Sequence, residues 1–583
     1  MKSEWNLDIL YKGLEDPAYE KDVAAFQLAC DSLHDLIAKA ADMPLKERIE
    51  ALLTCMENQR RLNSRLSGYL HLRLSTNAQD GKIMSEQNRL SRMSSACAAD
   101  QTAARRILGD IPDVDALAEE SDLVSEYSSF LKRTKEDCSY LLSDEAEAMA
   151  SAMDMTGGSA WGQLQSYLTS TLKVDYDGGQ VTLSQIRNLA YSPDPAVRKA
   201  AYEAELASYE KIQDSVAFSL NNLKNQVSML CEKRGYGSAL ALSLKQARMS
   251  RQTLDAMMEA ITEYLPVFVK YFRKKGELLG HTDGLPWYDL FAPLGKSDKI
   301  YSLEECRDYL LTCFGTFTPQ MSDLMQEAFD HEWIDFYPRD GKRGGAFCSG
   351  LTDYRQSRIL TNYDGSFSAV DTLAHELGHA FHNRQMENER LMNRNSPMPV
   401  AETASTFNEV FLGAYAMKQA SSREERLALL ENDLREKSQC VVDIYSRYLF
   451  ESAVFEQSRK KFLMAGDLKQ LMLDAQEKAY GAGLAADCRH PYMWICKSHY
   501  YRSGLSFYNF PYAFGNLFAQ GLYTLYCKEG DAFIPRYKEM LRTTSVHTIE
   551  EDGALLGIDL TKKEFWEDSL KSIAAEIEEF CAL

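Results

Sequence analysis

The sequence predicts a mainly α-helical protein of two lobes, with a small β-sheet in the second lobe. Apolar residues recur at the spacing of one helix face along most of the chain, and the first such run is Val23, Phe26, Cys30, Leu33 and Ile37. Segments that alternate like strands are short and few. A chain of 583 residues also exceeds the size of a single compact core, which favours two or more lobes.

The first predicted elements are long helices that run to about residue 170. Pro44 suits the first turn of the second of these helices. Apolar residues then alternate between 172 and 183 around an Asp-Gly-Gly turn, which predicts a β-hairpin. We expect the lobe boundary at this hairpin, between an N-terminal helical lobe, 1–185, and a larger lobe, 186–583.

The second lobe opens with a helix signal in "SPDPAVRKAAYEAEL", where Asp194 can cap a helix that Pro195 begins. Helices continue to about Gly280. Between 285 and 365 glycine, proline and aromatic residues prevail, and "GGAFCSG" and "SRILTNY" are predicted strands. Beyond residue 366 the chain is predicted to be helical again.

Charge and composition exclude several classes of function. The net charge of −20 argues against nucleic-acid binding, because phosphates would be repelled. The N-terminal residues hold no apolar run typical of a signal peptide, and no stretch of about 18 apolar residues follows, so no membrane association is expected. The thirteen cysteines are scattered, odd in number and free of CxxC pairs, which is typical of reduced thiols in a cytoplasm. We therefore expect a cytoplasmic protein, whose oligomeric state the sequence does not indicate.

One helix concentrates chemically active side chains. The stretch "DTLAHELGHAFHN", residues 371–383, holds three of the ten histidines in the chain. Its apolar residues mark one helix face, and Ser368 with Asp371 fits a capping box. A helix here places histidines four positions apart on the same side.

His375 and His379 are this pair, and together they can bind one zinc ion at about 2.1 Å from each nitrogen. Glu376 lies beside them, placed to take a proton from the water that the metal activates. His382 lies about 10 Å further along the axis than His375, too far for both to reach one ion. The metzincin spacing also fails, since it requires histidine where this chain has Gln385.

A third ligand should therefore be an acid from another helix. The stretch "NSPMPVAETASTFNEVFLG" offers Glu402 and Glu409, seven residues apart and thus on one side of a helix. One can bind the metal while the other orients a ligand. The spacing alone does not choose between them.

The pairing of "HELGHAFH" with "VAETASTFNE" resembles the thimet oligopeptidase and oligoendopeptidase F family of zinc metallopeptidases, and is closest to oligoendopeptidase F. The similarity covers nearly the whole chain, through "WNLDILY", "GGSAWGQL", "PDPAVRKAAYEA", "WYDLFAP", "GKRGGAFCSG" and a C-terminal "GID" followed by "FW". It implies a gluzincin-type fold in which two helical lobes enclose a deep cleft. It also implies that Glu402 is the third zinc ligand and that Glu409 supports a ligand from behind.

The negative charge that develops on an attacked peptide carbonyl requires donors that face the metal. The resemblance places them in "KSHYYRSGLSFYNFPYAFG", and by position they are His499, Tyr508 and Tyr512. Pro511 interrupts the expected helix just before Tyr512, which is a departure from the commonest family pattern.

The predicted strand "GGAFCSG" can bind an extended peptide through its main chain. Gly345 would let the substrate backbone approach closely, and the resemblance implies that Ala346 and Phe347 align it. Cys348 is expected to be a small buried filler. Gly378 in the metal helix costs about 1 kcal/mol of helix propensity, and we expect it to allow close packing against this strand.

Together these features predict a zinc endopeptidase of short peptides that binds one zinc ion per chain, in which Glu376 moves a proton from the attacking water to the leaving amine. One alternative is a zinc carboxypeptidase of similar helical fold, in which Arg343 or Arg502 would bind the substrate's C-terminal carboxylate. The other is an inactive helical peptide-binding protein, which the complete set of ligands argues against.

Overall fold

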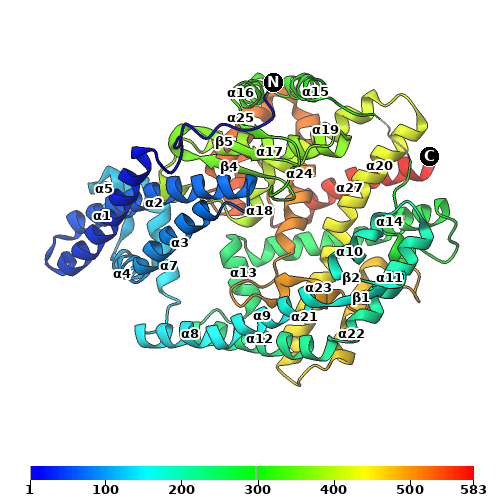
Figure 1. Ribbon diagram of the computed structural model, residues 1–583, viewed down its shortest axis with the longest axis horizontal. Coiled ribbons are helices and arrows are strands. Elements are labelled where there is room, and N and C mark those ends of the chain that lie inside the picture. The colour runs from blue at the N-terminus through cyan, green and yellow to red at the C-terminus, as the bar shows by residue number, and fades with distance from the viewer. Residues whose placement is uncertain (1, 296–298) are drawn as a thin grey trace.

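The structure is a computed structural model that describes residues 2–295 and 299–583 (Figure 1). Helices make up most of it, and the strands form two small sheets. This confirms the predicted fold class, a mainly α protein with a small sheet beside the histidine-bearing helix. Among the described residues no helix combines the length and the apolar character needed to cross a membrane.

The N-terminal helices lie at the left of Figure 1. Asp16, Asp80 and Asp113 cap three of them, because each carboxylate accepts hydrogen bonds from the first free backbone N–H groups. The helices are α1 (Pro17–Lys39), α2 (Leu45–Thr76), α3 (Gly81–Ala96), α4 (Ala98–Gly109), α5 (Val114–Glu120), α6 (Asp122–Glu126) and α7 (Ser128–Cys138).

A disulfide joins Cys30 of α1 to Cys97, between α3 and α4. The expectation that all the cysteines are reduced thiols is therefore wrong for this pair. Scattered positions in the sequence concealed it, because helix packing brings together two residues that are 67 positions apart.

The next helices are α8 (Asp144–Thr156), α9 (Gly158–Thr171), α10 (Leu183–Asn188), α11 (Pro195–Tyr209), α12 (Gln213–Arg234), α13 (Ala239–Ala247) and α14 (Arg251–Leu278). In Figure 1 they lie along the lower edge (α8, α9 and α12), at the right (α10, α11 and α14) and near the centre (α13). Asp194 caps α11 and Pro195 begins it, as predicted.

Two helices lie in the segment 285–365, for which the sequence predicted two strands and no helix: α15 (Leu303–Gly315) and α16 (Pro319–Asp330). A capping box between Ser302 and Glu305 starts α15, and the glycine- and aromatic-rich flanks concealed it. The remaining helices are α17 (Phe367–Gln385), α18 (Met398–Ala401), α19 (Thr403–Gln419), α20 (Arg423–Ser438), α21 (Ile444–Ser458), α22 (Ala465–Tyr480), α23 (Met493–Cys496), α24 (Phe510–Glu529), α25 (Phe533–Thr543), α26 (Ile549–Leu555) and α27 (Lys563–Ala582).

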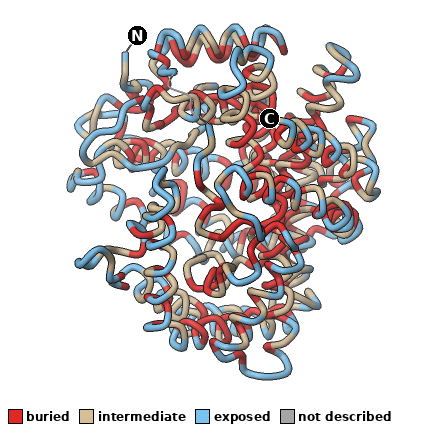
Figure 2. The backbone as a smooth tube through the Cα atoms, turned by 90° about the vertical axis from the view of Figure 1, so that its right-hand side faces the viewer, coloured by how far each residue is buried: buried red, intermediate tan, exposed pale blue. Residues whose placement is uncertain are grey.

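Buried apolar side chains form three clusters. The large one contains residues from Leu172 to Phe580, and the two smaller ones are built mainly from residues between Leu7 and Leu131. Figure 2 shows buried backbone concentrated through the interior and exposed backbone on the outer turns. The predicted division into 1–185 and 186–583 remains a prediction. The large cluster begins at Leu172, just before the hairpin, and the smaller clusters lie mainly before it.

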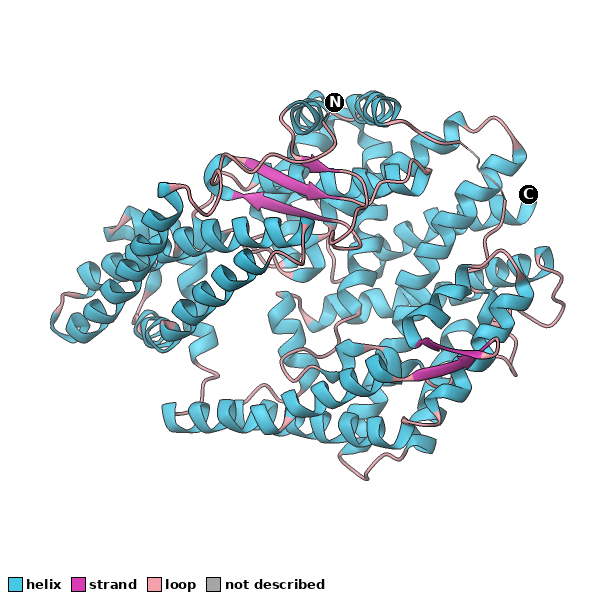
Figure 3. Ribbon diagram, in the orientation of Figure 1, coloured by secondary structure: helices cyan, strands magenta, loops and turns pink. Residues whose placement is uncertain are grey.

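The two sheets lie apart from each other in Figure 3. The predicted hairpin is present as β1 (Lys173–Tyr176) and β2 (Gly179–Thr182), with Asp177 and Gly178 at positive φ in the turn. The second sheet has the order β3-β5-β4, in which the predicted strands β4 (Phe347–Leu351) and β5 (Gln356–Leu360) are antiparallel. Strand β3 (Ile334–Asp335) was not predicted, since two residues are too few to show alternation.

Candidate metal centre

Helix α17 lies against strand β4 and carries both histidines of the predicted pair. Its buried face consists of Val370, Leu373, Leu377 and Phe381, as the spacing predicts. The N-cap, however, is Ser366, whose hydroxyl accepts from the backbone N–H of Ala369. The capping box predicted at Ser368 is wrong, because that residue already lies within the first turn of the helix.

His375, His379 and Glu402 form a cluster whose three candidate ligand atoms all lie within 4.8 Å of one another. It is the one such cluster of metal-ligating side chains among the residues that the structure describes. Glu402 Oε2 is 3.3 Å from His375 Nε2 and 3.1 Å from His379 Nε2. The three side chains remain 24%, 23% and 37% exposed, so a ligand or substrate can reach them.

These separations fit one bound metal ion. Tetrahedral coordination at about 2.1 Å places neighbouring ligand atoms about 3.4 Å apart, close to both observed distances. Two imidazole nitrogens and one carboxylate oxygen are also a donor set that suits zinc, with the fourth position left open.

From the sequence, Glu402 and Glu409 are expected on one helix. In the structure the helix is interrupted at Glu402. This residue stands at the junction of α18 and α19, with φ −92° and ψ 4°. This break turns its carboxylate towards Nε2 of both histidines, while Glu409 lies in the second turn of α19.

Glu409 approaches His375 from the opposite side. Its Oε1 lies 2.8 Å from His375 Nδ1, the nitrogen that points away from the cluster. Burial alone would lower the pKa of His375, but hydrogen bonds to Glu402 and Glu409 raise it to about 11. A metal ion would take the place of the Nε2 proton, because only neutral imidazole ligates.

Glu376 is 6% exposed, and its Oε2 is buried without a hydrogen-bond partner. Burial raises the pKa of this carboxyl, although His375 and His379 oppose the effect. An unpartnered buried carboxylate oxygen is costly unless something absent from the protein itself fills the position.

His382 points away from the cluster into the protein interior. Its Nε2 is 2.8 Å from Thr544 Oγ1 and 3.1 Å from the carbonyl oxygen of Leu541 on α25. Burial lowers its pKa to about 4, so it is a neutral core residue, in line with its exclusion as a ligand.

Gly378 closes the contact between α17 and α19. A Cβ at this position would lie 2.6 Å from Ala404 O and from Ser405 Cα. The prediction that Gly378 packs against the strand is therefore wrong, since its neighbour is the backbone of α19. Close packing of these two helices places Glu402 opposite the histidines, and Asn408 Nδ2 reinforces it by donating to Ala374 O at 2.9 Å.

His499, Tyr508 and Tyr512 lie together in the segment from the 3-10 turn η8 (Ser498–Tyr501) to the start of α24. The rings of His499 and Tyr508 stack at 5.5 Å, and the hydroxyls of Tyr508 and Tyr512 are 2.5 Å apart. Burial, Tyr508 and Glu402 all raise the pKa of Tyr512. Helix α24, which carries Tyr512, packs against α18 and α19, and a Cβ on its Gly515 would lie 3.8 Å from Glu402 Cβ. Pro511 does not interrupt the helix, because α24 begins at Phe510 and tolerates proline in its first turn.

The motif "GGSAWGQL" lies at the start of α9, which packs against η8. A Cβ on Gly162 would lie 2.4 Å from Tyr501 O, so α9 packs directly against the η8 backbone. Gln165 Nε2 donates to Ile495 O at 2.7 Å and holds the preceding turn.

Strand β4 is one of the two edge strands of its sheet in the part of the chain that the structure describes. Gly345, at φ +82°, and Ala346 lead into the strand, and no atom comes within 4 Å of a Cβ built on Gly345. Phe347 packs its ring against His71 at 5.3 Å and Trp5 at 6.2 Å. Burial and the nearby Glu376 raise the pKa of the Cys348 thiol, which agrees with a filler instead of a reactive thiolate.

Two polar residues next to His499, Asn509 and Arg447, were not identified from the sequence. Asn509 Nδ2 lies 2.9 Å from His499 Nε2, and Arg447 lies 3.2 Å from Asn509 Oδ1. Asn509 is a polar residue within an aromatic run, which was a usable signal. Arg447 gave none, since it is 62 residues away in the sequence.

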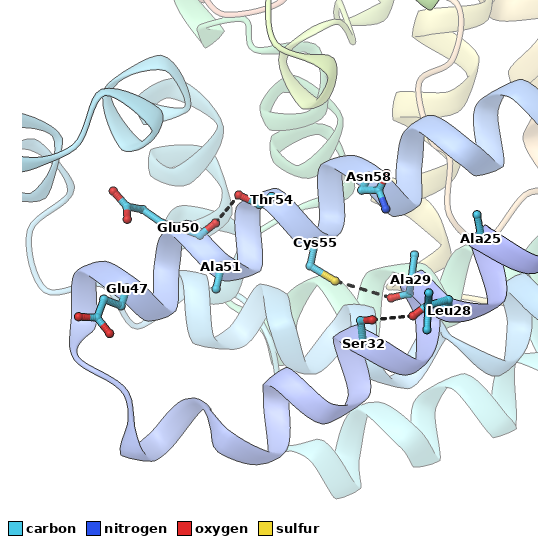
Figure 4. Close-up of a pocket in the computed structure, with 10 residues that line it drawn as sticks. All are labelled: Ala25, Leu28, Ala29, Ser32, Glu47, Glu50, Ala51, Thr54, Cys55 and Asn58. Carbon is cyan, nitrogen blue, oxygen red and sulfur yellow. Dashed lines mark hydrogen bonds between the residues drawn. The ribbon is translucent and has the colours of Figure 1, made fainter. Parts of the chain in front are cut away.

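A groove of about 680 Å³ lies elsewhere, between α1 and α2 (Figure 4). Its lining mixes small apolar residues with polar ones such as Glu47, Glu50 and Asn58, and it contains none of the predicted site residues. The chemistry therefore belongs to the cluster on α17 and α19.

Comparisons with known proteins agree with this geometry. The model of the family described as Peptidase family M3 matches residues 315–572, and that described as Oligopeptidase F matches residues 111–173, together more than half of the chain. Oligopeptidase PepF of Bacillus subtilis (strain 168) is 24% identical over 592 residues, which covers 99% of this chain and 86% of that protein. An oligoendopeptidase F homolog of Lactococcus lactis subsp. lactis (strain IL1403) is 28% identical over 388 residues, covering 66% of this chain and 64% of that protein.

Solved structures share the fold. A protein of Chlamydophila abortus has a TM-score of 0.85 at 20% identity, with 100% of this chain and 98% of that chain covered. The oligoendopeptidase-F of Enterococcus faecium has a TM-score of 0.71 at 18% identity, covering 96% and 97% of the two chains. The chain thus belongs to peptidase family M3, and it is a metallo-oligopeptidase of the oligoendopeptidase F type.

Proposed function

We propose that this protein is a zinc-dependent oligoendopeptidase, which hydrolyses internal bonds of short peptides. The observation that carries the proposal is the separation of 3.3 and 3.1 Å between Glu402 Oε2 and the two histidine nitrogens. His375, His379 and Glu402 would hold one zinc ion, and Glu409 would keep His375 oriented through Nδ1. When bound, zinc would supply a Lewis acid and an activated water nucleophile.

Glu376 would act as the general base. Its unpartnered Oε2 faces no competing donor, and burial raises its pKa towards the range in which a carboxylate transfers protons readily. We infer that Oε2 accepts a proton from the attacking water and then delivers it to the leaving amine nitrogen.

Donors for the developing oxyanion would come from His499, Tyr508 and Tyr512. The two phenols share one hydrogen bond of 2.5 Å, so one hydroxyl proton lies between them and the other is free to point outward. A raised pKa keeps Tyr512 protonated at neutral pH, which a donor requires.

The edge of β4 would bind the substrate backbone. Gly345, Ala346 and Phe347 offer main-chain groups in an extended or open conformation next to α17. Recognition of backbone instead of side chains fits relatives that are named oligopeptidase and oligoendopeptidase F.

Cleavage of an end-blocked peptide tests the proposal. An acetylated and amidated peptide of about ten residues offers no free terminus, so only an endopeptidase cuts it. We expect internal cleavage, its loss with a chelator and its return with added zinc. The same peptide with free ends is the control. Trimming of this control from its C-terminus alone would favour the carboxypeptidase, and no cleavage of either peptide would favour the inactive binding protein.

The carboxypeptidase alternative gains no structural support from its two candidate cations. The Arg343 guanidinium lies over the Phe347 ring at 5.9 Å, and Arg502 is exposed. A cytoplasmic location remains a proposal, and the cysteine argument for it is weakened because Cys30 and Cys97 are bonded.

A further inference from the structure

Asn509 stands at the N-cap of α24, yet it does not cap the helix. Asparagine at this position usually accepts from the helix's free backbone N–H groups, whereas here no such bond is made. The side chain is 4% exposed and points instead to His499 and Arg447. Asn509 thus makes two hydrogen bonds to side chains in place of a helix cap.

Arg447 fixes which way the Asn509 amide points. Its guanidinium nitrogens can only donate, so the atom of Asn509 that lies 3.2 Å away must be Oδ1. The Nδ2 amide therefore faces His499 and donates to Nε2 at 2.9 Å. A neutral imidazole that accepts at Nε2 carries its proton on Nδ1.

Arg447 is itself anchored. It forms an ion pair with Asp443, one turn earlier, and Asp443 also accepts from the Tyr480 hydroxyl at 3.2 Å. Asp443 ends a π-helical turn, η6 (Gln439–Asp443), that precedes α21. Such turns are often found at functional sites because they shift side chains out of α-helical register.

We propose that Asn509, oriented by Arg447, is a positioning residue that holds His499 as the Nδ1–H tautomer, so that this N–H is the donor offered to the substrate. The inference rests on the proposed function of His499. It adds that the tautomer of His499 is set by a series of contacts that runs from Asp443 through Arg447 to Asn509.

The charges around His499 are consistent with a neutral ring. Burial lowers its pKa to about 2, and Arg447, Lys497, Lys224 and Arg502 act in the same direction. The imidazole therefore does not titrate between pH 5 and 9, and the tautomer alone decides which nitrogen donates.

Asn509→Asp and Asn509→Leu separate positioning from packing. Aspartate matches the shape of asparagine but accepts instead of donating, so it draws the proton to Nε2 and raises the pKa of His499. At high pH the ring is then neutral with no proton on Nδ1, and at low pH it is an imidazolium that regains the Nδ1–H donor. We expect the kcat of Asn509→Asp to lie about 10- to 100-fold below that of wild type where His499 is neutral, and to recover towards wild type as the pH falls through the raised pKa of His499, with KM and zinc content nearly unchanged.

Asn509→Leu removes both hydrogen bonds without imposing the wrong tautomer. We expect a loss of kcat of a few-fold that does not depend on pH. A merely structural role for Asn509 predicts the reverse order, since leucine changes the shape of the site and aspartate does not. Equal, pH-independent effects of the two variants would overturn the inference.

His499→Phe distinguishes failure of this inference from failure of the proposed function. If Asn509 acts through His499, Asn509→Asp should cause no further loss of kcat in the His499→Phe background. A full additional loss would overturn the positioning role and leave the function of His499 intact. Wild-type kcat in His499→Phe would overturn the assigned donor and the inference with it.

A measurement on the unmodified enzyme guards against variants that fail to fold. Protein labelled with ¹⁵N-histidine reports the protonation of each ring nitrogen by its chemical shift, and His499→Phe identifies the signals of residue 499. We expect the proton on Nδ1. A proton on Nε2 of the unmodified enzyme would contradict the inference.

Discussion

Two carboxylates approach one imidazole from opposite sides at the centre of this molecule. Glu402 lies 3.3 Å from His375 Nε2, and Glu409 lies 2.8 Å from His375 Nδ1. Only the first of these positions also reaches His379, at 3.1 Å. The difference in geometry predicts different consequences when each acid is removed.

Glu402→Ala should therefore be purified essentially without zinc, because it loses one of three protein ligands. Glu409→Ala should still bind zinc, with an affinity or activity about 10- to 100-fold lower, since it loses only the group that orients His375. Metal analysis of both variants after identical dialysis, followed by zinc titration, measures the difference. Retention of zinc by Glu402→Ala together with its loss from Glu409→Ala would reverse the two roles.

At the scale of the helix pair, Gly378 determines how closely α17 and α19 approach. A methyl group there would lie 2.6 Å from backbone atoms of residues 404 and 405, which cannot move aside as a flexible side chain could. Gly378→Ala should lower the free energy of unfolding by about 1–3 kcal/mol or more through overpacking. It should also weaken zinc retention, because Glu402 moves away from the histidines with α19.

Gly413→Ala is the matched control on α19. No atom lies within 4 Å of a Cβ built there, so alanine should raise helix stability by about 0.5–1 kcal/mol and leave zinc binding unchanged. Denaturant unfolding and metal analysis of both variants provide the comparison. If Gly378→Ala is as stable as Gly413→Ala and retains zinc equally well, close contact between the two helices does not position the third ligand.

The elements that follow from local pattern were predictable from the sequence. Apolar spacing gave α17 and its buried face, and the Asp-Gly-Gly turn gave the hairpin. The helix break at Glu402 was not predicted from the sequence, because the contacts made there depend on the fold: the Glu402 carboxylate reaches both histidines and also accepts from Ser405 Oγ. The cap at Ser366 was missed because two serines, at 366 and 368, both have capping chemistry.

Contacts between distant segments were also beyond the sequence. The disulfide and the link from Arg447 to Asn509 join residues 67 and 62 positions apart, and periodicity carries no information at that range. In contrast, the candidate ligands were found because His375 and His379 are local and the family resemblance supplied Glu402.

For the whole molecule, separate apolar clusters on the two sides of the hairpin are the basis of a prediction about substrate size. We expect peptides of roughly 5 to 20 residues to be cut and folded proteins to be left intact, because a site enclosed by the two predicted lobes would admit only a flexible chain. Incubation with a stable globular protein and with a set of its synthetic fragments, read by mass spectrometry, measures the selection.

The control for size selection is the same globular protein after unfolding, which presents a long but flexible chain. Slow cutting of the unfolded chain alongside rapid cutting of the fragments would be expected of a narrow entrance. Efficient digestion of the native protein would contradict the idea that the lobes restrict access.

The most direct test of the central claim is Glu376→Gln, which preserves shape and removes the base. Zinc content should stay near one ion per chain, since His375, His379 and Glu402 are unchanged. Turnover of the end-blocked peptide should fall by at least 10²- to 10⁴-fold, about the effect of losing a general base. Near wild-type turnover by a variant that carries zinc would falsify the assignment of Glu376 and of the mechanism built on it.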